Sequence, residues 1–159
     1  MRREKTISPV GAERVSAGAY GSLIAASTLI GVGGQPIGTI IGIVVLTNLV
    51  YYATHVFAYS IGPGDGAVGW KNVSHHLRVS APMLSAAFLP VVVVVIGTAF
   101  GLSTVTATQI GVIVATLVLC GVAVTGARLR GIRGWPLVFV ATGTAVLAAA
   151  LILAKYSLH

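Results

Sequence analysis

A line of polar side chains follows one face of the second apolar stretch of the sequence. Asn48, Tyr52, His55 and Tyr59 recur at steps of four, three and four residues, and Tyr51 lies beside them. Such spacing places side chains on one face of a helix. Amide, phenol and imidazole groups all form hydrogen bonds, and an imidazole can also carry a proton near neutral pH. Because buried polar groups need partners, this face is expected to point into a helical bundle.

Tyr20 of the first apolar stretch is expected at the same depth as His55, and a Tyr20–His55 hydrogen bond is the preferred pairing. The predicted intrabundle polar cluster is therefore Tyr20, Asn48, Tyr52, His55 and Tyr59. Three roles stay open for His55: a neutral imidazole that holds two helices in register, a proton or ligand contact in a small cavity, and a metal ligand.

The remaining chemistry-bearing residues are few. The only acids are Glu4, Glu13 and Asp65, all expected in or near cytoplasmic water, and Cys120 is the single cysteine. No apolar stretch contains an acid, and no catalytic triad, phosphate-binding loop or zinc motif is present. The sequence therefore predicts no enzyme, no cofactor and no metal.

The elements that position these residues are membrane spans. Only 8% of the residues are charged, and none lies between Ala81 and Ala127, which is about twice the length that a bilayer needs. The predicted fold class is all-α, a polytopic transmembrane helix bundle. It has a cytoplasmic tail at 1–13, a short interfacial amphipathic helix at about 67–80, and five spans at about 14–33, 36–61, 81–101, 104–126 and 135–156.

The interfacial helix carries Trp70, Val73 and Leu77 on one face and cations on another. The alternative is that this segment forms the wet first turns of the next span. His75 and His76 are adjacent, so their side chains diverge. They are expected on a solvated face near lipid phosphates rather than on a metal.

The ten Lys and Arg residues set the orientation. Nine fall on one side when five spans alternate, which predicts a cytoplasmic N-terminus and an outside C-terminus. The net charge of +7 is spread in short clusters at span ends, so nucleic acid is excluded and anionic lipid headgroups are the expected partner. The predicted lipid-interface residues are Trp70, Lys71, Arg78, Arg128, Arg130 and Arg133.

Small residues and a proline are expected to shape the packing. Ala17, Gly21 and Ala25 form a stripe on the first helix, and Gly38-x-x-x-Gly42 opens the second. Both stripes favour close packing within the bundle, with a homodimer face as the alternative. Pro90 is expected to kink the third span.

Tyr20-Gly21, the run Thr54-His55-Val56-Phe57-Ala58, a proline in the third span and Lys155 before His159 form a wider pattern. It resembles a group of small uncharacterised integral membrane proteins of high-GC Gram-positive (actinobacterial) bacteria. In that group an Ala-His pair is usual where Thr54-His55 stands here, and an acid often follows near position 60, where this chain has Ser60. The resemblance implies a bacterial membrane protein and no particular activity.

The functional expectation is a structural or accessory protein of the bacterial cytoplasmic (inner) membrane, as a homo-oligomer or in a larger membrane complex. The alternative is a small-solute, proton or ion permease or channel that uses the Tyr/His/Asn cluster.

Overall fold

The computed structural model describes residues 8–61 and 69–157, and helices make up most of them without any strand. The six helices are α1 (Pro9–Val32), α2 (Ile37–Ile61), α3 (Trp70–Ser80), α4 (Pro82–Ala99), α5 (Thr104–Leu129) and α6 (Trp135–Ser157). The predicted all-helical class is confirmed for these residues.

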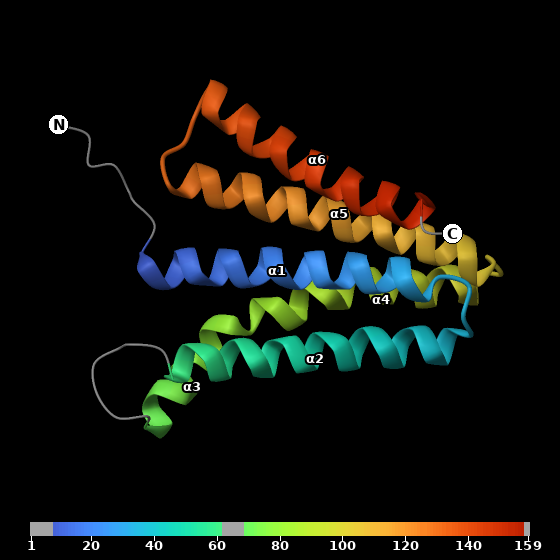
Figure 1. Ribbon diagram of the computed structural model, residues 1–159, viewed down its shortest axis with the longest axis horizontal. Coiled ribbons are helices and arrows are strands. Elements are labelled where there is room, and N and C mark those ends of the chain that lie inside the picture. The colour runs from blue at the N-terminus through green and yellow to red at the C-terminus, as the bar shows by residue number, and fades with distance from the viewer. Residues whose placement is uncertain (1–7, 62–68, 158–159) are drawn as a thin grey trace.

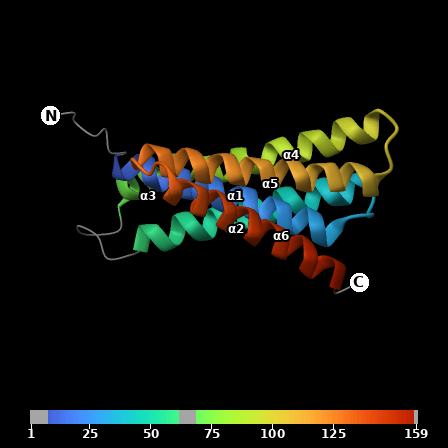
Figure 2. The same cartoon turned by 90° about the horizontal axis from the view of Figure 1, so that it is seen from above.

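The long helices form one bundle in which α1 is central (Figure 1). α1 packs most extensively on α5 and α4, α2 covers α4 and α1 on one side, and α6 lies outermost against α5. The start of α1, the short α3 and the α5–α6 connection share one end of the bundle, as Figures 1 and 2 both show. The α1–α2 and α4–α5 connections lie at the other end, with the end of α6.

Four helical segments are long and apolar enough to cross a membrane: Pro9–Val32, Ile37–Ile61, Trp70–Ala99 and Thr104–Leu129. A shorter apolar stretch, Trp135–Ala150, begins α6. Many large apolar side chains of these helices are exposed, among them Leu46, Phe57, Leu117 and Leu147. A surface of this kind is suited to lipid rather than to water.

The first helix begins at Pro9, so the predicted tail is wrong for residues 9–13. The Ser8 hydroxyl accepts a hydrogen bond from the Gly11 backbone N–H at 3.2 Å, and Pro9 occupies the first turn. The first backbone N–H groups of a helix have no acceptor within the helix. A capping serine accepts a hydrogen bond from one of them, and proline has no N–H that needs an acceptor, so the pair is a favourable helix start. Residues 1–7 lie outside the described part of the chain.

The predicted interfacial helix runs directly into the third span. Only Ala81 separates α3 from α4, and its backbone is itself helical. Pro82 has no N–H to donate to the preceding turn, so the chain can change direction here at little cost. α3 is amphipathic, and it is also the continuation of α4 beyond the bend; its position at a membrane interface stays a prediction. Residues 67 and 68 lie outside the described part.

Two helices end in the same glycine-dependent hydrogen-bond pattern. Gly101 and Gly131 have φ angles of +87° and +80°, which favour glycine. The next residue then bonds back to the final turn, at 3.0 Å from Leu102 N to Gly97 O and from Ile132 N to Ala127 O. Carbonyl groups that would otherwise lack donors at the ends of α4 and α5 are satisfied in this way.

Glycines allow the central helices to approach closely. A Cβ placed on Gly21 of α1 would overlap the Met83 carbonyl oxygen of α4 and lie 2.7 Å from the Met83 Cα. A Cβ on Gly111 of α5 would lie 2.6 Å from a methyl carbon of Val94. Leu29, Val44, Val94 and other buried apolar residues form the core beside these contacts.

The second glycine pair does not pack within the chain. Gly38 and Gly42 are exposed, and a Cβ added to either meets nothing within 4 Å. The expectation of close packing at Gly38-x-x-x-Gly42 inside this bundle is therefore wrong. The reason is rotation: α2 turns Ile40 and Val44 toward the core, which leaves the glycines outward.

Replacement of Gly21 by alanine is expected to destabilise the bundle by about 1–3 kcal/mol, because the new methyl group has to displace the α4 backbone. Thermal unfolding of the purified protein in detergent, followed by circular dichroism, measures the loss. Gly31→Ala is the matched control on the same helix, since a Cβ at Gly31 meets nothing within 4 Å. Equal unfolding temperatures for the two variants would contradict the packing argument.

Candidate functional site

Two members of the predicted polar face of α2 bind backbone carbonyl groups. Asn48 is only 1% exposed, and its Nδ2 donates to the Val44 carbonyl of the same helix at 2.9 Å. The Tyr52 hydroxyl donates to the Leu77 carbonyl of α3 at 2.9 Å. The Tyr52 bond fastens α2 to α3 near the bend, where the helix-ending carbonyls of α3 need donors.

The other members of that face join residues of α3 and α1. The rings of His55 and Tyr59 lie 4.6 Å apart between centroids, and Tyr59 lies 5.7 Å from His76 of α3. His76 Nδ1 lies 3.3 Å from Glu13 Oε1 of α1. His55, Tyr59, His76 and Glu13 thus form a chain of contacts across three helices, which we call the ring cluster.

The ring cluster lies at the end of the bundle where α1 begins and α2 ends. Glu13 and His76 are largely buried, whereas half of the Tyr59 surface is exposed. When His76 is protonated, it and Glu13 form an ion pair between α1 and α3. The cluster therefore brings two imidazoles, a phenol and a carboxylate together, all of which can accept or release protons.

Three buried side-chain polar atoms have no hydrogen-bond partner among the described residues. They are His55 Nε2 in the ring cluster, Ser80 Oγ at the end of α3 and Asn48 Oδ1 near the middle of α2. A buried acceptor or donor without a partner costs free energy. Each of these atoms could therefore bind a water molecule or a small polar ligand.

Tyr20 does not join the cluster, so the predicted Tyr20–His55 hydrogen bond is wrong. The Tyr20 side chain is 57% exposed, and His55 contacts the Tyr59 ring instead. Ala17, Gly21 and their neighbours turn toward α4 and α5, and this rotation carries Tyr20 to the edge of the buried face. The prediction rested on Tyr20 and His55 lying at the same depth in the bundle, but depth does not determine the direction in which the Tyr20 side chain points.

Sequence reasoning missed the Glu13–His76 contact. His76 was expected on a solvated face, and the two residues are 63 positions apart on different helices. Helical periodicity relates residues within one helix only, so no spacing in the sequence could have indicated this pair.

The predicted lipid-interface residues are exposed and gather at one end of the bundle. These residues are Trp70, Lys71, Arg78, Arg128, Arg130 and Arg133. They are carried by α3, the last turn of α5 and the α5–α6 connection. Within the described ranges, no group of three or more His, Cys, Asp or Glu side chains is placed to hold a metal ion.

Comparison with known proteins adds no relative: no family model, no curated protein and no solved structure matches this chain.

We expect Tyr52→Phe to destabilise the protein by about 1 kcal/mol, because the Leu77 carbonyl loses its side-chain donor. The unfolding midpoint in detergent measures the effect. Tyr51→Phe is the matched control, because the Tyr51 side chain is half exposed on the neighbouring position. If both variants unfold at the wild-type temperature, the Tyr52 hydroxyl does not stabilise the α2–α3 contact.

Proposed function

We propose that the chain is a non-enzymatic integral protein of the bacterial cytoplasmic membrane with a structural or accessory role. In this proposal α1, α2, α4, α5 and α6 cross the bilayer, and α3 lies at the cytoplasmic surface. The N-terminus is cytoplasmic and the C-terminus is outside. The clustering of exposed Lys and Arg side chains at the end where α1 begins supports this orientation.

The observation that carries the proposal is the tight packing of the bundle centre. A Cβ added to Gly21 would overlap the Met83 backbone. A Cβ added to Gly111 would lie 2.6 Å from a Val94 methyl carbon and 3.3 Å from the Pro90 carbonyl oxygen. Leu29 and Val94 are fully buried beside these contacts. Helices in such contact leave no room for a solute to pass through the bundle centre at the level of Gly21 and Gly111.

The hydroxyl groups of the helices support the same conclusion. Ser22, Thr28 and Thr108 each donate to a carbonyl four residues earlier in their own helix, at 2.7–2.9 Å. Such groups are already satisfied and need no water-filled path beside them. The exposed outer helix α6, with Phe139, Val146 and Leu147 on its surface, offers an apolar face to lipid or to a neighbouring membrane protein.

One observation favours a second candidate, a small proton or ion permease. His55 Nε2 and Asn48 Oδ1 are buried and without partners among the described residues, and His55 belongs to the ring cluster. The His55 imidazole would bind or pass a proton at the cytoplasmic end of the bundle, and Asn48 Oδ1 would accept a hydrogen bond from a water molecule nearer the middle of α2.

Cysteine labelling tests the orientation. In a Cys120→Ala background, Asn72→Cys and Leu129→Cys are expected to react with a membrane-impermeant maleimide only after cells are permeabilised. Gln35→Cys and Leu102→Cys at the opposite end are expected to react in intact cells. All four positions are exposed. Labelling of Asn72→Cys and Leu129→Cys from opposite sides would overturn the five-span arrangement.

Proton flux separates the two candidate functions. Proteoliposomes with a pH-sensitive dye inside are expected to dissipate an imposed pH gradient no faster than protein-free liposomes. A flux that His55→Gln abolishes, and that the exposed control His75→Gln retains, would replace the structural proposal by the permease. Circular dichroism confirms that each variant is folded before it is reconstituted.

A further inference from the structure

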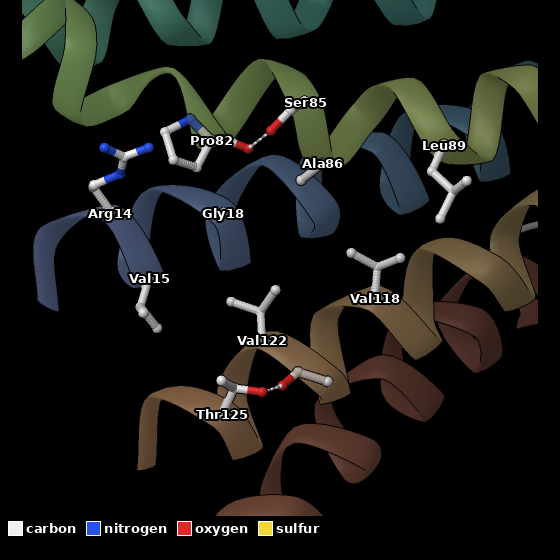
Figure 3. Close-up of a pocket in the computed structure, with 11 residues that line it drawn as sticks. Arg14, Val15, Gly18, Pro82, Ser85, Ala86, Leu89, Val118, Val122 and Thr125 are labelled. Atoms are coloured by element: carbon white, nitrogen blue, oxygen red, sulfur yellow. Dashed lines mark hydrogen bonds between the residues drawn. The ribbon is translucent and has the colours of Figure 1, made fainter. Parts of the chain in front are cut away.

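An elongated groove opens where α1, α4 and α5 part, at the end of the bundle where α1 begins. Its volume is about 550 Å³, and its lining includes Arg14, Gly18, Pro82, Ala86, Val118 and Gly121. Figure 3 shows Arg14 at one end of this groove and Leu89 at the other. We call it the Arg14 groove.

Small residues make the groove hollow. Gly18 and Gly121 contribute no side chain and Ala86 only a methyl group, while a Cβ at Gly121 would meet nothing within 4 Å. The groove spans about seven residues of α4 and of α5, so it is about 10 Å long. That length suits the upper part of one extended hydrocarbon chain.

Three polar side chains line the groove: Arg14, Ser85 and Thr125. The Ser85 hydroxyl donates to the Pro82 carbonyl at 3.1 Å, and the Thr125 hydroxyl donates to the Gly121 carbonyl at 2.7 Å. The rest of the lining is apolar. The Arg14 groove thus combines one cationic side chain at its end with an apolar lining. This combination is complementary to a molecule with an anionic head and a hydrocarbon tail.

No acidic side chain of residues 8–61 and 69–157 pairs with the Arg14 guanidinium. Glu13, the one acid within the described residues, lies against His76, about 100° around α1 from Arg14. Arg14 is exposed and lies beside Pro82 in Figure 3. A guanidinium binds a phosphate through two parallel hydrogen bonds, which a lysine cannot match.

We propose that the Arg14 groove binds an anionic phospholipid of the cytoplasmic leaflet, with its phosphate on Arg14 and one acyl chain along Gly18, Ala86 and Gly121. This inference rests on the proposed membrane orientation, which places Arg14 at headgroup level on the cytoplasmic side. The exposed Lys and Arg side chains at this end would contact many headgroups weakly, whereas the proposal gives one lipid molecule a defined site in the Arg14 groove.

Lipid titration followed by native mass spectrometry tests the proposal. The purified protein in neutral detergent is expected to bind phosphatidylglycerol about fivefold more tightly than phosphatidylcholine with the same acyl chains, because both lipids carry the phosphate but the trimethylammonium group of phosphatidylcholine cancels its charge and is repelled by Arg14. Arg14→Gln is expected to bring that ratio close to one. Arg133→Gln is the matched control, because Arg133 is exposed at the same end but does not line the groove. An equal effect of both variants would show diffuse surface charge instead of a site.

A second variant tests the groove itself. Gly121→Leu fills open space and is expected to weaken binding of both lipids while the unfolding temperature is kept. Gly143→Leu adds the same side chain to open space on α6 and is expected to bind lipid like the wild type. Unchanged lipid binding by Gly121→Leu would overturn the proposal. So would a wild-type dimer that Gly121→Leu dissociates, because a second copy would then occupy the groove.

The cysteine-labelling experiment keeps the two proposals distinguishable. If Asn72→Cys and Leu129→Cys are cytoplasmic but the lipid preference is absent, the lipid site fails and the membrane orientation stands. If the labelling pattern fails, both fall together.

Discussion

The close contact between α1 and α4 at Gly21 and Met83 determines much of this structure. Inside a bilayer, lipid tails are as apolar as leucine, so burial of apolar surface gives little preference for one helix over another. Dispersion between closely approaching backbones then becomes decisive. A helix with a glycine at the contact can approach only on the face that carries the glycine. The contact therefore fixes the rotation of α1 as well as its distance from α4.

The rotation of α1 accounts for several features that seem unrelated. Glu13 and Tyr20 are seven residues apart, so they lie on the same edge of α1. At the level of Glu13, α3 covers this edge and supplies His76. Tyr20 lies two turns farther along, where its side chain is exposed. Arg14, one residue after Glu13, is turned by about 100° and reaches the groove between α4 and α5.

The helices and their approximate ends could be predicted from the sequence. Uncharged blocks, glycine turns and cationic flanks are properties of one segment at a time, and the structure has helices where those signals lie. The start of α1 was missed because the predicted tail was extended from the charged residues near the N-terminus as far as Glu13, whereas the Ser8 cap and Pro9 already begin the helix. Four helical segments meet the length and apolarity needed to cross a membrane, and α6 adds a shorter apolar stretch.

The candidate site could be predicted only in part. Spacing placed Asn48, Tyr52, His55 and Tyr59 on one face of α2, but it could not supply their partners. The prediction that this face points into the bundle is wrong for Tyr59, which is half exposed. The Leu77 carbonyl is a backbone group, and its accessibility depends on the bend at Pro82. Gly38 and Gly42 show that spacing within one helix does not identify its neighbours. A small-residue motif allows another helix to approach closely, but no helix of the bundle lies against these two glycines.

Pro90 gives α4 a mechanical property that its sequence neighbours lack. The Ala86 carbonyl would normally accept from the residue four positions later, but Pro90 has no N–H, and Pro82 leaves the Arg78 carbonyl in the same situation. Two backbone hydrogen bonds are therefore missing, at Pro82 and at Pro90. The part of α4 between these prolines forms one wall of the Arg14 groove. This wall can therefore bend at both margins without breaking a backbone hydrogen bond, while the contact between Gly21 and the Met83 backbone keeps its geometry.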